Sequence, residues 1–202
     1  MGLNMYLTKT KKVEGFKVED YFKVDNVISD SNEIDLEKET GLQNANELLN
    51  QIKLRGKHFQ WYSIFSEVGY WRKANQIHKW FVKHVQNNVD DCGTYEVSVG
   101  QLRDLLALCK AVKKASKLID GQVSQGQRGT ADGWETIYGE GKIIEDSSVA
   151  EELLPTGSGF FFGSTDYNEY YMQDINATIK IINKVLKETD FETHGVAYSS
   201  SW

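Results

Sequence analysis

The stretch EVGYWRKANQIHKWFV, from Glu67 to Val82, carries most of what the sequence says about fold and site. Its apolar residues recur at helical intervals, which predicts a helix from near Gly69 to Asn87 or Asn88. The apolar face of this helix would comprise Trp71, Ala74, His78, Phe81, Val82 and Val85. Trp80 falls on the opposite side of the helical wheel, so it is predicted to face solvent.

Two polar residues, Asn75 and His78, lie on this inward-facing side of the predicted helix. In one interpretation both are buried and are hydrogen-bonded by the ends of neighbouring strands, because buried polar groups need partners. In the other they face a cleft that binds something polar, with Arg72 and Lys79 on its rim. The sequence leaves both interpretations open.

A second polar and glycine-rich block, GSGFFFGST, runs from Gly157 to Thr165 and superficially looks like a phosphate-binding loop. It fails the P-loop pattern, since five residues separate Gly157 from Gly163 and no lysine follows. The sequence predicts a turn and a short apolar strand here, followed by a long helix. Asp166 and Glu169 resemble a capping box at the start of that helix, which favours self-capping over anion binding.

The tyrosines that follow add an aromatic surface, which either packs on the core or forms the wall of a ligand site. Together the two blocks define a site hypothesis in which the polar helix residues meet the glycine-rich loop. The predicted ligand-binding residues are Arg72, Asn75, His78, Ser164, Thr165 and Tyr167. His78 is the best candidate for an acid or base, should the protein be an enzyme.

Elsewhere, alternation near Leu3–Thr10 predicts a first strand, and Val196, Tyr198 and Ser200 predict a last strand beside it. Residues 25–40 are acidic and predict a surface loop, and 44–55 predict a short helix. Residues 58–65 are either a strand or the lead-in to the helix that follows. The capping box formed by Ser98 and Gln101 predicts a helix over 99–118. Its apolar stripe consists of Leu102, Leu105, Leu106, Cys109 and Val112.

Residues 119–148 differ in composition and are predicted to be an insertion. Their first half is polar and rich in glycine, which predicts a loop. Their second half predicts two short strands that reverse around Gly139–Gly141.

Composition limits the class of protein. The chain has 202 residues and a net charge of −6, which fits one domain and disfavours a general nucleic-acid binder. No apolar run approaches the roughly 20 residues of a membrane span, and the first residues do not resemble a secretory signal. Cys92 and Cys109 form no CxxC motif, and His78 and His84 are not spaced as metal ligands. We therefore expect a cytoplasmic protein without metal or cofactor.

Four blocks together resemble a family of small conserved proteins found in bacterial and phage genomes. These blocks are MGLNMYL at the start, EVGYWRKANQIHKWFV, LLPTGSGFFFGSTDYNEYY, and YSSSW at residues 198–202. The resemblance implies a self-contained cytoplasmic domain, encoded by a phage or prophage, and no particular activity. The stretch 119–148 is extra relative to the compact form of that family.

The expected fold is one α+β domain over residues 1–202, with about three main helices on a small mixed or antiparallel sheet and the 119–148 hairpin inserted. The leading functional hypothesis is an intracellular protein that binds a small polar molecule or a host protein and so interferes with a host pathway. One alternative is a small enzyme acting on a polar or nucleotide-like substrate. Another is a purely structural or interaction module that uses Trp80 and the insertion. Oligomeric state is left open.

Overall fold

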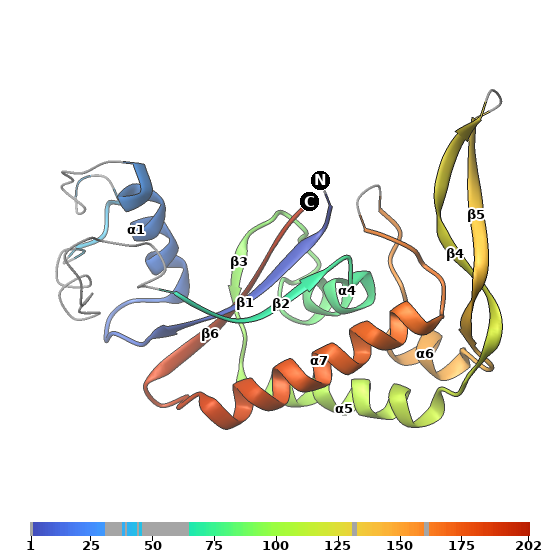
Figure 1. Ribbon diagram of the computed structural model, residues 1–202. Helices are drawn as coiled ribbons and strands as arrows, with labels where there is room; N and C mark the ends of the chain where they lie inside the picture. Colours follow the sequence, from blue (N-terminus) through green and yellow to red (C-terminus); the bar gives the residue numbers. More distant parts are fainter. Residues whose placement is uncertain are drawn as a thin grey trace.

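The computed structural model describes residues 2–30, 38, 40–43, 45, 65–130, 133–159 and 162–202. In this part of the chain, a four-stranded antiparallel sheet packs against helices, and a separate two-stranded hairpin projects away from them (Figure 1). The predicted α+β class with an inserted hairpin is confirmed. No helix among the described residues is long and apolar enough to cross a membrane.

The sheet has the strand order β2-β1-β6-β3. These strands are β1 (Asn4–Lys11), β2 (Ser66–Arg72), β3 (Thr94–Glu96) and β6 (His194–Ser201). The hairpin consists of β4 (Leu118–Thr130) and β5 (Gly133–Ile144). The described helices are α1 (Val18–Asp30), α4 (Asn75–His84), α5 (Val99–Ala115), α6 (Ser148–Leu153) and α7 (Glu169–Glu188).

The first and last strands pair along their whole length, from Asn4 opposite Ser201 to Lys11 opposite His194. This confirms the expectation that they are neighbours. The two-residue repeat of a strand sends Met5 and Leu7 to the core, where they are fully buried, while Tyr6 and Thr8 face the other way and stay half-buried. The sheet therefore has one face in the core and one more open face.

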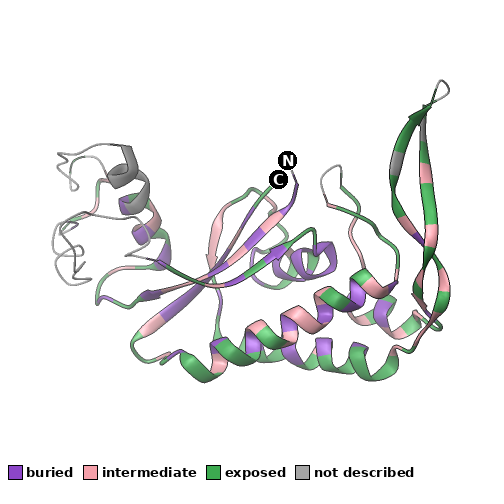
Figure 2. Ribbon diagram, in the orientation of Figure 1, coloured by how far each residue is buried: buried purple, intermediate pink, exposed green. Residues whose placement is uncertain are grey.

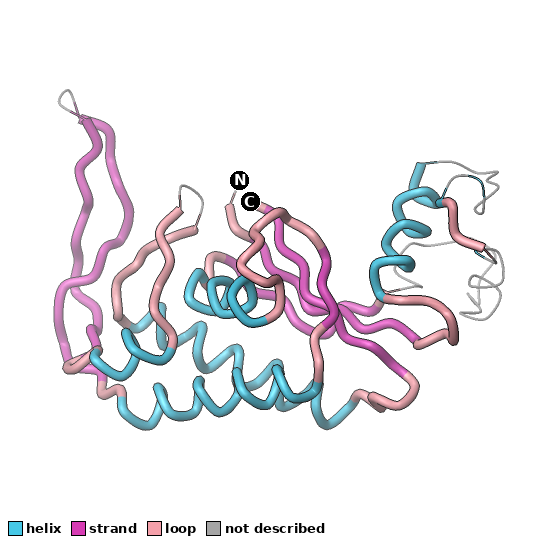
Figure 3. Tube along the Cα trace, turned by 180° about the vertical axis from the view of Figure 1, so that it is seen from behind, coloured by secondary structure: helices cyan, strands magenta, loops and turns pink. Residues whose placement is uncertain are grey.

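Helices α5 and α7 lie side by side as a layer against the core face of the sheet, and the tube seen from behind shows the same arrangement (Figure 3). The capping box of α5 is formed as predicted, because the Ser98 hydroxyl accepts from the Gln101 N–H and the Gln101 side chain accepts from the Ser98 N–H. The predicted apolar stripe of α5 is also buried. Burial is concentrated along β1, α4 and the facing sides of α5 and α7 (Figure 2).

The predicted helix from Gly69 to Asn87 or Asn88 is wrong at both ends: residues 69–74 are not helical, and the helix ends at His84. Ser66–Arg72 is strand β2, and α4 begins only at Asn75. The cause is tertiary: β1 offers an unpaired edge, and the partners Tyr6–Tyr70 and Leu7–Gly69 satisfy backbone groups that a helix would otherwise satisfy internally.

The predicted exposure of Trp80 is also wrong, since only 5% of this residue is exposed. Trp80 packs edge-on against Phe81 and stacks on His84. Lys79, Lys83 and His84 on the same side of α4 remain exposed, so Trp80 is buried by its packing and not by its place on the helical wheel. An interaction surface built on Trp80 is therefore ruled out.

The segment before α7 differs from the expectation in two ways. Its described residues form no strand, and α6 precedes it where a turn was predicted. The N-cap of α7 is Asn168, whose side chain accepts from the N–H groups of Tyr170 and Tyr171, so the box predicted from Asp166 and Glu169 is not formed. Asparagine is as good an N-cap as aspartate. Asn168 lies two residues after the predicted cap, Asp166, and the helix that begins after it buries Tyr171.

The hairpin is longer than predicted. Residues 120–130, expected to be a loop, form most of β4, and Thr130 pairs with Gly133, so the reversal lies between them and not at Gly139–Gly141. Polar strands are stable here because each is paired with the other over its length, mostly away from the core. Residues 25–30 belong to α1 and not to a loop. The helix predicted over 44–55 and the strand or helix lead-in predicted over 58–65 lie almost wholly outside the described residues.

Candidate functional site

Asn75, at the start of α4, binds the backbone of the glycine-rich loop through hydrogen bonds. Its Nδ2 donates to the carbonyl oxygens of Phe162 at 3.1 Å and Ser164 at 2.8 Å. Its Oδ1 accepts from the Gly157 N–H at 3.0 Å. One buried amide thus satisfies three backbone groups of a segment without regular structure. Asn75 therefore contacts the glycine-rich loop directly, as the site hypothesis expected.

His78, one helical turn further on, is equally committed within the protein. Its Nδ1 lies 2.7 Å from the Tyr198 hydroxyl and its Nε2 lies 3.0 Å from a carboxylate oxygen of Asp90. The other Asp90 oxygen accepts from the Trp202 indole N–H at 3.1 Å. Only 2% of His78 is exposed, so neither ring nitrogen is free to reach a substrate from solvent. Phe162 contacts the imidazole edge-on.

The predicted loop residues mostly fix the loop's own shape. The Ser164 hydroxyl donates to Asp166, and the Thr165 carbonyl accepts from the Thr156 hydroxyl at 3.1 Å. Tyr167 reaches back to the same place, since its hydroxyl accepts from the Thr156 N–H at 3.2 Å. These contacts bring Ser164, Thr165 and Tyr167 into one neighbourhood with Thr156 and Asp166, while Ser164 and Thr165 stay exposed.

An open cavity of about 400 Å3 lies next to this cluster. Two of the predicted residues, Arg72 and Ser164, line it, whereas Asn75, His78, Thr165 and Tyr167 do not. The rest of the lining comes from the turn after β2, the start of α4, the loop before α7, the start of α7 and the hairpin, including Lys73, Gln76, Ser124, Gln173 and Asp174. The lining is mixed in charge and rich in hydrogen-bonding groups.

Arg72 and Lys73 are the cationic residues of this cavity. Both are exposed, and neither makes a side-chain hydrogen bond or an ion pair with any described residue. Lys73 occupies the left-handed region with φ of 60°, in the turn that connects β2 to α4. The turn therefore places two unpaired positive charges side by side at the mouth of a polar cavity.

Asp174 on α7 is the residue that sequence reasoning missed. Burial raises the pKa of its carboxyl group to about 6, and a hydrogen bond donated by the Gln76 amide at 3.2 Å opposes part of that rise. Gln76 is itself buried. The signal in the sequence was spacing: Asp174 and Thr178 lie four residues apart, beside the apolar stripe of α7. In the structure the Thr178 hydroxyl accepts from the Trp71 indole N–H.

Among the described residues, no group of three or more His, Cys, Asp or Glu side chains is placed to hold a metal ion. Comparisons with protein-family models, with curated proteins and with solved structures find no match to this chain.

Proposed function

We propose that the protein binds a small polar molecule carrying an anionic group, in the cavity between the end of β2, the start of α7 and the hairpin. The observation that supports this most is the pair Arg72 and Lys73, two cations without a partner among the described residues at a polar cavity. A guanidinium offers five N–H donors in a fixed plane that suits a carboxylate or phosphate.

The rest of the lining fits a ligand with neutral polar groups behind its anionic group. Gln173, Ser124 and Tyr170 offer donors and acceptors, and Asp174 offers a carboxyl that is partly protonated near pH 6. A purely anionic ligand would leave these groups unsatisfied, and a purely apolar one would leave Arg72 and Lys73 uncompensated. Asn75 supports the proposal indirectly, since it holds the loop that forms one wall.

The test is to purify the protein from cells and to identify by mass spectrometry the small molecules that it retains. Binding of the recovered molecule, and of inorganic phosphate as a defined anion, is then measured by calorimetry. Arg72→Ala should weaken binding by about tenfold or more, the expected loss of a charge-assisted contact. The melting temperature should barely change, because the Arg72 side chain is exposed and has no partner among the residues that the structure describes.

Arg103→Ala is the matched control, since Arg103 is an exposed arginine on α5, away from the cavity. It should bind as the unmodified protein does. Equal affinity of Arg72→Ala and Arg103→Ala for the retained molecule would overturn the proposed site.

A second candidate function, an enzyme acting on the same kind of molecule, is favoured by Asp174. A carboxyl with a pKa of about 6 exchanges its proton near neutral pH, as a general acid or base must. It takes the role first considered for His78, whose ring nitrogens are both occupied. Turnover of the retained molecule that Asp174→Asn abolishes while binding persists would support the enzyme.

A phage or prophage origin, a host-protein partner and interference with a host pathway rest on the resemblance of the sequence blocks alone. They stay predictions, and so does the intracellular location. The small-molecule proposal does not depend on them.

A further inference from the structure

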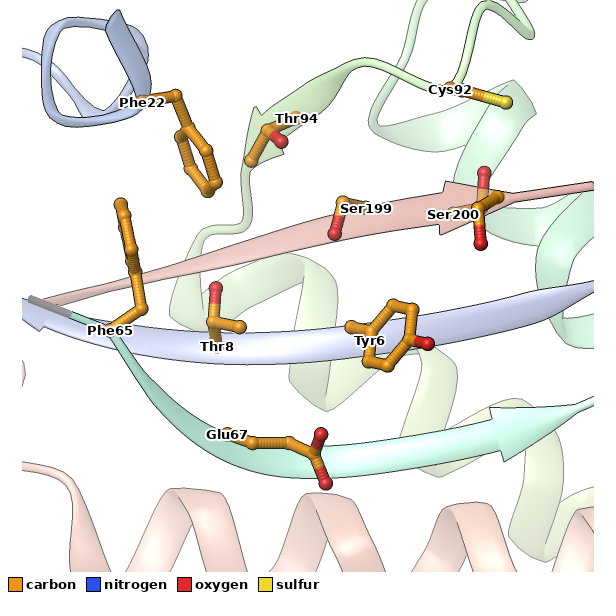
Figure 4. Close-up of a pocket in the computed structure, with 10 residues that line it drawn as sticks. Tyr6, Thr8, Phe22, Phe65, Glu67, Cys92, Thr94, Ser199 and Ser200 are labelled. Atoms are coloured by element: carbon orange, nitrogen blue, oxygen red, sulfur yellow. The ribbon is translucent and has the colours of Figure 1, made fainter. Parts of the chain in front are cut away.

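A second cavity, of about 440 Å3, lies over the open face of the sheet and shares no lining residue with the first. Its floor is a cross-strand row in which Tyr6 of β1 pairs with Ser199 of β6, and Ser199 pairs with Thr94 of β3. Figure 4 shows Tyr6, Ser199 and Thr94 around one hollow, with Glu67 of β2 at its side.

Aromatic rings close one end of this cavity. Phe22 of α1 stacks on Phe65, with ring centroids 4.2 Å apart and planes 20° from parallel. Tyr6 adds a third ring, which is tilted against Tyr70. Figure 4 shows the Phe22 and Phe65 rings facing each other at the end opposite Cys92. This end suits a flat apolar group, because aromatic faces bury large areas and stack on rings.

The charge of the lining has one sign. Glu67 is its charged residue among those the structure describes, and its carboxylate makes no hydrogen bond or ion pair with them. The Thr8 hydroxyl on β1, which lies opposite Glu67 and also lines the cavity, is an acceptor beside it. A cation placed here is attracted by the charge of the carboxylate and, in addition, by the quadrupoles of the neighbouring aromatic rings.

We propose that this cavity is a second binding site, which takes an organic cation: an amine with an aromatic or apolar body. The body lies against Phe22 and Phe65, and the ammonium group donates to the Glu67 carboxylate and to the Thr8 hydroxyl opposite it. An ammonium has three N–H donors and no acceptor, which matches this set. The ligand class is opposite in charge to that of the first cavity, and the two cavities share no lining residue.

Cys92 provides a reporter specific to this cavity. Its thiol is exposed and belongs to the lining, whereas Cys109 is fully buried and burial raises its pKa to about 12. A thiol reagent such as dithionitrobenzoate should therefore modify Cys92 first. A ligand in the second cavity slows that reaction, and a ligand in the first cavity leaves its rate unchanged.

The probes are 2-phenylethylamine, neutral 2-phenylethanol and anionic 3-phenylpropionate, at millimolar concentration. The amine should slow the modification of Cys92 and the other two should bind about tenfold more weakly, the order of effect for one charge contact. Glu67→Gln should remove the preference for the amine. Glu140→Gln, which changes an exposed carboxylate of the hairpin, should keep it.

Tyr6→Phe and Tyr6→Leu separate the ring from its hydroxyl. The phenylalanine variant should bind the amine as well as the unmodified protein, and the leucine variant should bind it less tightly. Equal protection by the amine and the alcohol, an unchanged preference in Glu67→Gln, or no protection by the amine would each overturn the proposal. A folded state for every variant is verified by circular dichroism.

Discussion

At the scale of single residues, the polar groups in the middle of the Glu67–Val82 stretch hold separate chain segments together. Asn75 contacts the loop before α7, and His78 joins β6 to the loop that carries Asp90. A buried amide or imidazole with satisfied partners has a defined orientation, because rotating it would leave several groups unpaired. This placement agrees with the interpretation of both residues as buried and hydrogen-bonded, and it puts Arg72 closer to a cavity than either.

Asn75→Ala should lower the free energy of unfolding by about 1–3 kcal/mol, because it leaves partly buried backbone groups without this partner. Three hydrogen bonds to residues 157, 162 and 164 are lost together. Urea denaturation measures the change. Asn176→Ala is the control, since the Asn176 amide donates only to the Met172 carbonyl within α7, and its loss should cost little.

Asp174 gives the protein a predictable dependence on pH. Its folded-state pKa of about 6 lies above its ordinary value of 3.8, so the folded state holds this proton more tightly than the unfolded state does. The resulting stability is fully present below about pH 4 and is lost as the pH rises through about 6. Ionised Asp174 therefore costs stability at neutral pH.

Asp174→Asn should remove that cost, because an amide stays neutral and its oxygen can still accept from Gln76. The variant should gain up to about 3 kcal/mol relative to the unmodified protein at pH 8, and the gain should shrink on acidification toward pH 4. Denaturant unfolding at several pH values measures it. A difference between the two proteins that does not vary with pH would show that Asp174 titrates normally.

At the scale of secondary-structure elements, the close approach of β2 to α7 depends on Gly69. A Cβ atom placed on Gly69 would lie 2.5 Å from the Cγ2 atom of Ile181 on α7. The same contact region carries the hydrogen bond from Trp71 to Thr178 at 2.9 Å. The strand therefore needs a residue without a side chain at this position.

Gly69→Ala should destabilise the fold by about 1–3 kcal/mol, the usual cost of overpacking. The double variant with Ile181→Ala should lose less than the sum of the two single variants, because each change makes room for the other. Thermal unfolding of all three proteins measures this coupling. Gly100→Ala on α5 is the control: its added Cβ meets nothing closer than 3.8 Å, and alanine favours a helix.

At the scale of the whole molecule, the hairpin divides into a base that belongs to the core and an outer part that does not. Ile144 is buried, its N–H donates to the Tyr167 carbonyl at 3.0 Å, and the Lys142 N–H donates to the Glu169 side chain at 3.0 Å. Val123 is buried as well. The outer part rises away from the helices and is mostly exposed (Figure 2).

Replacing residues 128–135 by Asn-Gly should therefore leave a cooperatively folded protein with a similar melting temperature. The shortened hairpin keeps the partners Gln127 and Thr136 next to a favourable two-residue turn. The ion pair that it loses, Arg128 with Glu135, is exposed and contributes little. Removing 121–146 instead should reduce stability clearly, since that deletion takes Val123 and Ile144 from the interior. Calorimetry of both deletions distinguishes these outcomes.

Much of the fold could be predicted from sequence where local signals decide it. The capping box and apolar stripe of α5, the alternation in β1 and β6, and the compositional break at the hairpin depend on neighbours a few residues apart. Such signals act in the same way in any context, because caps and periodic apolar faces need no information from distant chain segments.

Tertiary structure alone decided the rest. Residues 69–72 fit a helical pattern, yet β1 supplies an edge that makes them a strand. Trp80 fits an exposed position, yet neighbouring segments cover it. Both cavities are built from residues far apart in the chain. Neither the cations Arg72 and Lys73, which have no partner among the described residues, nor the pKa of Asp174, nor the Glu67 carboxylate over the open sheet face has a sequence signature. By itself the sequence determined which segments are apolar and where helices can begin. Packing determined which polar groups have hydrogen-bond partners and which face a cavity, because the partners of a polar group come from distant segments that only the fold brings beside it.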